Sequence, residues 1–374
     1  MKRLAIACRQ VDGVTGTTTT ILEHARRLRG LGWTVHVYAE RLDEGRIASA
    51  GGEPRRIRGL PIGGGLRRKF FAWRFERSLR RERYDLVWGH GDTWTQDVLS
   101  LHNCVHAAHE AVHGAGLPLG SNVGRMHGRI LRERGFRLLI ANSELMRRDV
   151  VERFKVPVEK TVVILPGYDP ARYRVSDRAR LRDPRRRELG VGPDELLVGL
   201  ITSGDFVKRG VRQFLEALPR LSSVVRARLR VIVIGQESRL SPYFALARET
   251  GLRVRFLRPT PDVAATYHAL DLYVHPALYE EFGQSVQEAM ACGVAVLAGR
   301  RVGACELLGP LAPEISVEGP DPAGLAAAME PLLLDKGLRE RRAEQGRRAV
   351  LSNTWDANFK KTYEALEGLL AGRG

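Results

Sequence analysis

An arrangement of strand, glycine-containing loop, amphipathic helix and strand occurs twice in this chain, and it limits the possible folds more than any other feature. In the first copy, a strand at Leu4–Cys8 and a Gly/Thr-rich loop at Arg9–Thr20 precede a helix that ends at the glycines Gly30 and Gly32. A second strand follows at Thr34–Ala39. The apolar residues of the helix recur with the helical period, which predicts that one face is buried.

The second copy has the same order of elements. It begins with the strand Glu195–Thr202, continues through the loop Ser203–Gly210 and a helix, and ends in the strand Leu229–Ile234. This order is typical of the βαβ unit of a parallel sheet. Further strand-like runs follow each copy, at Asp85–Trp88, Leu138–Ala141, Val162–Leu165, Val254–Leu257, Leu272–Val274 and Val294–Ala298. We therefore predict an α/β protein with two Rossmann-like domains facing each other across a cleft.

The length of the chain agrees with two domains. At 374 residues it can form two full hydrophobic cores. The stretch Asp169–Gly192 is rich in Arg, Pro and Asp and carries little apolar patterning, so we predict that it is the linker. We place one domain at residues 1–168 and the other at 169–354.

The formal net charge of +17 calls for an anionic partner. Nucleic acid, an anionic membrane surface and a phosphorylated substrate would each serve. The sequence lacks a helix-turn-helix, zinc or RRM signature, so a nucleic acid is not expected. No stretch approaches the ~18–20 apolar residues of a membrane span. Four scattered cysteines without a CxxC pair favour a reduced cytoplasm.

The stretch His275–Val296 is the most informative for chemistry. Glu280 and Glu288 would differ by about 80° on one continuous helix. We therefore expect Glu280 to end a loop and a helix to begin near Gly283, which leaves unpaired backbone N–H groups at Gly283, Gln284 and Ser285 as an anion site. A carboxylate at Glu288 could accept hydrogen bonds from a ribose diol. By spacing alone, an exposed amphipathic helix with solvated glutamates explains the pattern equally well.

The loop after the strand Glu195–Thr202 carries two adjacent cations, Lys208 and Arg209, beyond Gly204. Two cations there can neutralise a diphosphate and stabilise a leaving nucleotide. The simpler interpretation is two solvated charges. Against it, basic residues at a helix N-terminus oppose the helix dipole unless an anion is present.

These segments resemble a known family. The residues Glu280-Glu281-Phe282-Gly283, followed by Glu288-Ala289-Met290-Ala291-Cys292-Gly293, resemble the E-x7-E signature of retaining family-4 glycosyltransferases with the GT-B fold. The resemblance implies that Glu288 holds the donor ribose and that Glu280 lies beside the transferred sugar. It also implies that the amides of Phe282–Ser285 face the diphosphate and sugar, and that the loop of Gly204, Lys208 and Arg209 grips the phosphates. Arg258 falls where family members place backbone around the nucleobase.

The resemblance extends to the first half of the chain. There it implies substrate contact for the loop residues Gly13, Gly16 and Thr17, which match neither a Walker A motif nor G-x-G-x-x-G. It places His102 beside the donor sugar, with Asp97 nearby. It assigns acceptor binding to domain 1–168 and nucleotide-sugar binding to domain 169–354, with a C-terminal helix at 355–374 that packs back on the first.

No metal or cofactor is predicted. The sequence contains no Asp-x-Asp, the pair that commonly holds a donor diphosphate through a divalent cation, so we expect metal-independent catalysis. The spacing of His102, His106, His109 and His113 fits one helix face, but acidic residues of matching geometry are missing.

Within the family, the adjacent cations are most similar to the lipopolysaccharide core glucosyltransferase I type. That similarity implies a hexose, glucose from UDP-glucose, moved to a cell-surface glycan such as lipopolysaccharide core. Three alternatives stay open. They are transfer of another sugar, such as mannose from GDP-mannose, to a lipid-linked or polysaccharide acceptor; a sugar-nucleotide epimerase; and a nucleic-acid-binding protein.

A basic amphipathic segment lies at Leu66–Arg83, with eight Lys/Arg residues against two glutamates. Its aromatics are typical of a helix on an anionic membrane surface. The alternative is a helix whose apolar stripe packs on the sheet with solvated charges opposite. Both fit a cytoplasmic protein that associates peripherally with the inner face of the membrane and acts on an anionic glycan or glycolipid.

Overall fold

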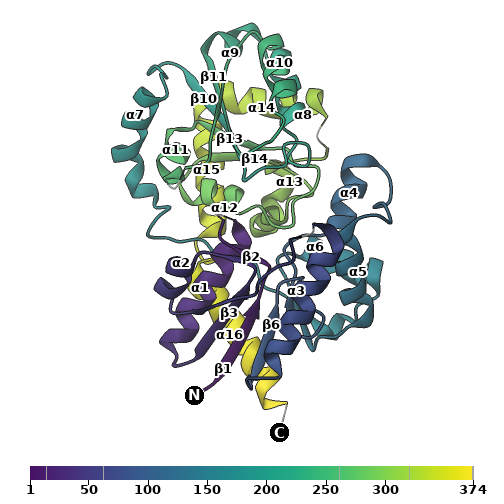
Figure 1. Ribbon diagram of the computed structural model, residues 1–374. Helices are drawn as coiled ribbons and strands as arrows, with labels where there is room; N and C mark the ends of the chain where they lie inside the picture. The colour runs from purple at the N-terminus through teal and green to yellow at the C-terminus, as the bar shows by residue number, and fades with distance from the viewer. Residues whose placement is uncertain (14, 62, 261, 320, 373–374) are drawn as a thin grey trace. The chain divides into compact units, whose positions relative to one another are not determined.

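The computed structural model describes residues 1–13, 15–61, 63–260, 262–319 and 321–372. It divides into two compact units, one formed by Met1–Pro166 with Trp355–Gly374 and the other by Gly167–Thr354 (Figure 1). Val14, in the predicted substrate loop, and the last two residues of the predicted C-terminal helix lie outside the described residues.

The first unit is built on a seven-stranded sheet in the order β5-β3-β1-β6-β7-β8-β9, with every neighbouring pair parallel. A separate parallel pair joins β2 to β4. The strands are β1 Arg3–Ala7, β2 Gln10–Val11, β3 Thr34–Ala39, β4 Arg41–Leu42, β5 Glu53–Arg56, β6 Leu86–Gly89, β7 Val98–Ser100, β8 Leu138–Ala141 and β9 Thr161–Val163. The helices are α1 Gly16–Gly30, α2 Glu44–Ser49, α3 Gly64–Leu79, α4 Val105–His113, α5 Asn122–Glu133, α6 Glu144–Phe154, the 3₁₀ turn η1 Val158–Lys160 and the C-terminal α16 Trp355–Ala371.

The C-terminal helix α16 belongs to the core of this first unit. Its Leu366 is fully buried in the cluster that contains Leu4, Ile6 and Trp33. Asn358 is also buried and donates to the carbonyl oxygen of Leu165 at 2.8 Å. Figure 1 shows the yellow helix among the purple and blue elements from the other end of the chain.

The second unit has a six-stranded parallel sheet in the order β12-β11-β10-β13-β14-β15. Its strands are β10 Leu196–Ile201, β11 Leu229–Ile234, β12 Arg253–Leu257, β13 Leu272–His275, β14 Ala295–Gly299 and β15 Ser316–Val317. Its helices are α7 Arg178–Glu188, α8 Val211–Ala217, α9 Ser223–Arg228, α10 Ser241–Glu249, α11 Val263–Ala269, α12 Gln284–Ala291, α13 Ala312–Ile315, α14 Pro322–Leu334 and α15 Lys336–Val350, with the 3₁₀ turns η2 Val175–Asp177, η3 Leu218–Arg220 and η4 Gly303–Leu311.

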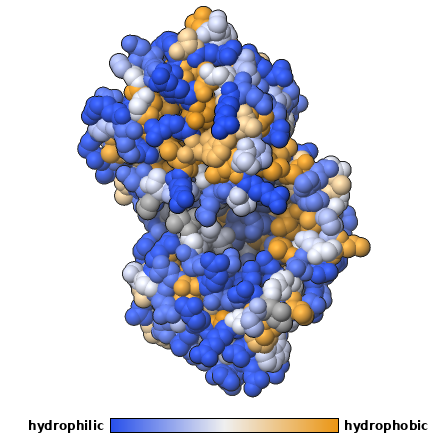
Figure 2. Space-filling view, turned by 45° about the horizontal axis from the view of Figure 1, so that its top comes forward, coloured by the Kyte–Doolittle hydropathy of each residue, from blue (hydrophilic) through white to orange (hydrophobic). Residues whose placement is uncertain are grey.

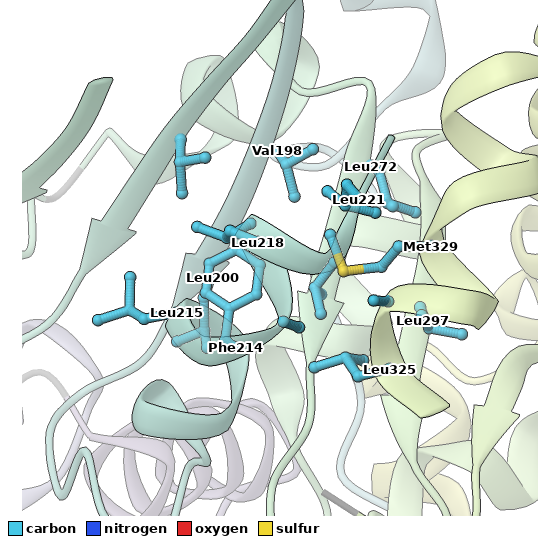
Figure 3. Packing of buried hydrophobic residues seen from close by; sticks show 14 of the residues in the cluster. Val198, Leu200, Phe214, Leu215, Leu218, Leu221, Leu272, Leu297, Leu325 and Met329 are labelled. Carbon is cyan, nitrogen blue, oxygen red and sulfur yellow. The ribbon is translucent and has the colours of Figure 1, made fainter. Parts of the chain in front are cut away.

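The core of the second unit lies between the sheet and the helices α8 and α14. Val198 and Leu200 of β10 meet Phe214 of α8, and Leu325 and Met329 of α14 close the cluster (Figure 3). These side chains are fully buried. Burying a large apolar side chain contributes about 1.5–3 kcal/mol, so this cluster fixes the strands whose ends carry the candidate site.

Two parallel α/β sheets were predicted, and this is confirmed. The predicted strands are found within one or two residues of the expected positions, but five strands were not predicted, namely β2, β4, β5, β7 and β15. The first loop is shorter than predicted, because α1 begins at Gly16 rather than after Thr20. The reason is the side chain of Thr15, which accepts a hydrogen bond from the backbone N–H of Thr18 and caps the helix early.

The prediction of a linker at Asp169–Gly192 was wrong over much of its length, because it contains the helix α7. The arginines of α7 lie on the C-terminal end of α11. Arg182 donates to the carbonyl oxygens of the last two α11 residues and of Leu270, which follows them, while Arg186 is 5% exposed. Both guanidinium groups also bind Asp271. Cations are favourable at a helix C-terminus. The arginines of α7 therefore hold this helix against α11, where an apolar stripe would ordinarily do so.

Across the described ranges, no helix is long and apolar enough to cross a membrane. Figure 2 shows a face covered largely by hydrophilic residues, with hydrophobic patches between them.

Candidate functional site

The loop between β13 and α12 carries the residues of the E-x7-E pattern, and the predicted start of the helix is confirmed. Gly283 caps α12 with φ of 92°, a left-handed conformation that favours glycine. A Cβ there would lie 2.9 Å from Cγ1 of Val302, so a larger residue would also clash. With Gly283 at this position, the amides of Gln284 and Ser285 fall in the first turn, and Glu288 falls in the second.

Glu288 is held by two tyrosines from different segments. The Tyr267 hydroxyl donates to its Oε2 at 3.0 Å, and the Tyr173 hydroxyl also hydrogen-bonds to the carboxyl group. Burial raises the pKa of Glu288 to about 7, although both tyrosine hydrogen bonds act in the opposite direction. The carboxyl group therefore changes its protonation state near neutral pH.

The two cations of the β10–α8 loop form ion pairs with the two glutamates of the β13–α12 loop. Nζ of Lys208 lies 2.7 Å from Oε2 of Glu281, and Nη1 of Arg209 lies 2.6 Å from Oε2 of Glu280. Burial alone would raise the pKa of Glu280, but Arg209, His275 and Lys208 hold it at about 2. Glu280 is therefore a permanent anion at neutral pH.

Close backbone contacts hold these loops together. A Cβ on Gly204 would lie 2.7 Å from the carbonyl oxygen of Gln236, and one on Gly210 would lie 2.2 Å from that of Pro276. The loop after β10 thus lies directly against the chain that leaves β11 and β13. Only glycine permits this approach.

Two further buried residues complete the site. His275 lies with Nε2 3.6 Å from the Glu280 carboxylate, and burial lowers the pKa of His275. The Tyr273 hydroxyl lies 2.8 Å from Oγ of Ser285 and 2.9 Å from the carbonyl oxygen of Ile201. Tyr273 therefore ties the first turn of α12 to the end of β10.

The sequence analysis did not predict Glu281, His275, Tyr273, Tyr267 or Tyr173 as site residues. Glu281 and His275 lie in the stretch already singled out, so a search for partners of Lys208 and Arg209 could have found them. Tyr173 lies in the predicted linker, where no sequence signal marks it. Arg258, which was predicted, follows β12 and is exposed.

In the first unit, His102 follows β7 and forms a pair with a second histidine. Nε2 of His102 lies 2.8 Å from Nδ1 of His90, and Nδ1 of His102 lies 3.3 Å from the side-chain nitrogen of Asn142. Burial lowers the pKa of His102 to about 4, so its ring is neutral at pH 7.

The predicted loop residues Gly13, Gly16 and Thr17 lie between β2 and the first turn of α1. The carbonyl oxygen of Gly13 accepts from Arg46 at 3.2 Å. Gly16 and Thr17 occupy the first two positions of α1, near the expected helix N-terminus.

Asp97, predicted to lie near the sugar together with His102, is placed at the other end of β7 from His102. It precedes β7, at the amino-terminal edge of the sheet, whereas His102 lies beyond the carboxyl end of the same strand. Oδ2 of Asp97 accepts from the amide of Val87 at 2.9 Å, and Arg137 lies 3.9 Å from Oδ1. Asp97 therefore joins neighbouring strands.

The four histidines considered as metal ligands do not share one helix face, because His102 precedes α4 while the other three belong to it. Among the residues that the structure describes, no group of three or more His, Cys, Asp or Glu side chains could hold a metal ion.

The basic segment forms α3, and its apolar residues divide into two sets. Phe71 and Phe75 are fully buried against Tyr38 and Ala5. Leu66 and Trp73 are exposed, at 63% and 46%. The core-packing interpretation therefore holds for part of the stripe only.

Residues 14–172 match the profile of "Glycosyltransferase Family 4", and residues 186–349 match that of "Glycosyl transferases group 1". The chain belongs to the family-4 glycosyltransferases.

Proteins similar in sequence to this chain include D-inositol 3-phosphate glycosyltransferases. The one from Salinispora arenicola is 30% identical over 254 residues, which is 63% of this chain and 56% of that protein. The one from Nocardia farcinica is 32% identical over 290 residues, 71% of this chain and 60% of that protein. The chain thus spans a little over half the length of these relatives.

Solved structures show the same fold over nearly the whole chain. WaaG, a glycosyltransferase involved in lipopolysaccharide biosynthesis, superposes with a TM-score of 0.85 at 21% identity, covering 98% of this chain and 100% of WaaG. Anabaena Alr3699/HepE in complex with UDP-glucose gives 0.78 at 18% identity, with 98% and 100% covered. The predicted GT-B fold class is confirmed.

Proposed function

We propose that this protein transfers a hexose from a nucleotide-sugar donor to a glycan acceptor with retention of the anomeric configuration. The observation that carries the proposal is the meeting of Lys208 and Arg209 with the loop that precedes α12. Two cations and a helix N-terminus in one place form a site for a diphosphate. Glu288, in the second turn of the same helix, supplies a carboxyl group for a ribose diol.

In this proposal each set of site residues has a separate role. The amides at Phe282–Ser285 and the loop at Gly204 bind the diphosphate, and Lys208 and Arg209 stabilise its charge as the nucleotide leaves. Glu280, fixed as an anion, lies beside the transferred sugar. His102 donates to or accepts from a sugar hydroxyl as a neutral imidazole, and Gly13, Gly16 and Thr17 contact the substrate from the first unit.

For the donor we propose UDP-glucose, without a metal ion. The solved HepE structure contains UDP-glucose, and the WaaG similarity points to the same group of enzymes. GDP-mannose is the alternative donor. Exposed Arg258, after β12, is the proposed contact to the nucleotide.

For the acceptor we propose an anionic glycan, such as lipopolysaccharide core. The net charge of +17 favours an acceptor that carries phosphate or carboxylate groups. The names of the relatives favour a second candidate, a phosphorylated inositol. Both candidates are anionic, so activity on each should fall with increasing salt.

The test begins with thermal unfolding in the presence of UDP, GDP, ADP and their sugar conjugates, each with and without EDTA. A ligand at 100 times its dissociation constant adds about 2.7 kcal/mol of stability. We expect a shift from UDP compounds alone, unchanged by EDTA. A shift from GDP compounds alone would overturn the donor, and loss of the shift with EDTA would overturn metal independence.

Two variants then test the residue roles. Glu288→Ala should mainly raise the dissociation constant for the donor, whereas Glu280→Ala should mainly lower kcat. Product from lipopolysaccharide core or from inositol phosphate, with its anomeric configuration read by NMR, decides the acceptor and the stereochemistry. Unchanged kinetics in both variants would overturn the site.

An anionic membrane surface is a further proposed partner, through the segment Leu66–Arg83. Leu66 and Trp73 project from α3 among its basic residues, a combination suited to lipid headgroups. Sedimentation with anionic and neutral vesicles tests this. Equal binding to anionic and neutral vesicles would contradict the proposal. So would unchanged binding to anionic vesicles in Trp73→Ser.

A further inference from the structure

A cavity of about 430 Å³ lies within the second unit, away from the candidate donor residues. Asp271 and Ala295 line it, and these residues stand at the amino-terminal ends of β13 and β14. The candidate donor residues follow the carboxyl ends of the strands, so the cavity lies at the opposite edge of the same sheet. Its volume falls within the ~300–1,000 Å³ range of small-molecule sites.

The lining of this cavity is basic. Arg178 and Arg182 come from α7, and Lys336, Arg339 and Arg347 come from α15. Three acidic residues, Asp271, Glu340 and Glu344, also line it.

Two of these acids are already shared between cations. Asp271 pairs with Arg182 and also with Arg186, which lies behind it. Glu344 pairs with both Arg347 and Arg348. Their negative charge is therefore balanced before the remaining cations are considered.

Arg178 and Arg339 have no carboxylate within ion-pair distance among the described residues. Arg339 donates to the carbonyl oxygen of Leu332 at 2.8 Å, and Nη2 of Arg178 donates to that of Leu270 at 3.3 Å. The cavity thus presents two guanidinium groups whose charge is not neutralised.

Arg178 also has an unused donor. Its Nη1 is buried and has no hydrogen-bond partner in the part of the chain that the structure describes. Burial and the neighbouring Arg182 lower the pKa of Arg178 to about 10. A buried donor without an acceptor costs free energy, and a bound anion would remove that cost.

We propose that this cavity binds a small anion bearing one or two phosphate groups, at a site separate from the donor site. Arginine presents a planar fork of N–H donors that matches phosphate oxygens, and several such groups converge here. The ligand is a free inorganic or organic phosphate rather than a polymer, because the site is a cavity of limited volume. The proposal does not depend on the transferase activity.

The test measures binding of inorganic pyrophosphate by calorimetry, at constant ionic strength. The donor site also offers cations to a diphosphate, so two charge-neutralised variants separate the sites. Arg178→Gln/Arg339→Gln should weaken pyrophosphate binding in the cavity at least tenfold. Lys208→Gln/Arg209→Gln should retain the binding event of the cavity with wild-type affinity. Arg180→Gln is the matched control, since Arg180 lies on α7 and pairs with Asp177, outside the cavity.

Three results would overturn the proposal: no binding by the wild type, unchanged affinity in Arg178→Gln/Arg339→Gln, or complete loss in Lys208→Gln/Arg209→Gln. The single variant Arg339→Gln guards against misfolding, because among the described residues Arg339 donates one side-chain hydrogen bond, to the carbonyl oxygen of Leu332 in the last turn of α14. It should weaken binding by itself while leaving the thermal unfolding midpoint of the free protein unchanged. Orthophosphate and glucose 6-phosphate, titrated in parallel, distinguish an inorganic from an organic ligand.

Discussion

Nδ1 of His90 and Nε2 of His102 lie 2.8 Å apart, and the two rings are nearly parallel, with 3° between their planes. One of these two nitrogens must donate and the other accept. Burial lowers the pKa of His102 to about 4 and that of His90 well below its ordinary value. Neither ring therefore gains a proton at neutral pH.

This pair predicts that His102 does not titrate between about pH 5 and 8, where an ordinary histidine would. The imidazole proton signals of the protein, followed by NMR over that range, check this, with His102→Gln assigning the signal. A midpoint near 6.5 for His102 would contradict the prediction. The pH profile of kcat/KM between about pH 5 and 8 should therefore have the same shape in the wild type and in His102→Gln.

Glu288 predicts a dependence on pH of both stability and nucleotide affinity. Burial raises its pKa to about 7, above the ~4.3 of an unfolded chain. The folded protein therefore binds the proton of Glu288 more tightly than the unfolded chain does. The contribution of this proton to the free energy of unfolding is fully present below about pH 4 and is lost as the pH rises through 7. A pKa that rises from ~4.3 to about 7 corresponds to roughly 3.7 kcal/mol at ~1.4 kcal/mol per pH unit. Because the Glu288 side chain is partly exposed, we expect a smaller loss, on the order of 2 kcal/mol.

Urea unfolding at several pH values tests this, with Glu288→Gln as the control that should abolish the dependence. The affinity for UDP should increase through pH 7 in the wild type, because the carboxylate accepts hydrogen bonds from a ribose better than the neutral acid. A wild type and a Glu288→Gln variant with parallel pH curves would contradict both expectations.

The fold was predictable because its signals are local. Buried parallel strands such as Leu196–Ile201 are continuous apolar runs, and glycines mark the loops between them. The strand β7 was missed because Val98–Ser100 is too short to show a pattern, so the sequence did not indicate that Asp97 precedes a strand.

The remaining errors come from partners distant in sequence. The arginines of α7 bind backbone oxygens and Asp271, more than eighty residues away, so no periodicity reveals a packed helix. The carboxyl of Glu288 is recognisable from its motif, but its tyrosine partners come from two separate segments. The motif thus selects the candidate residues, and only the fold shows which groups set their protonation.

The pair of Lys208 with Glu281 predicts a strong coupling between two charges. Their side chains are only 11% and 4% exposed, so removal of either partner leaves a largely buried charge. We expect Glu281→Gln to lower the free energy of unfolding by about 3 kcal/mol. A double-mutant cycle with Lys208→Met should give a coupling above about 1 kcal/mol.

The exposed pair Arg212–Glu216 is the matched control for that cycle. Its coupling should not exceed about 0.5 kcal/mol, because solvent screens it. Equal coupling in the two pairs would contradict the buried character of Lys208 and Glu281.

Arg186 should be the most sensitive arginine of α7. It is 5% exposed and donates to the carbonyl oxygens of Ala269, Gly192 and Glu195 as well as to Asp271. Arg186→Met keeps the length of the side chain but leaves these buried acceptors unpaired, so we expect a loss of about 3–5 kcal/mol in urea unfolding. Arg186→Lys should recover only part of the lost stability, because an ammonium group cannot reproduce the planar fork.

Arg187→Met, one residue away and exposed, should change stability by less than about 0.5 kcal/mol. Similar losses in Arg186→Met and Arg187→Met would show that α7 is held by its backbone alone and not by this buried guanidinium.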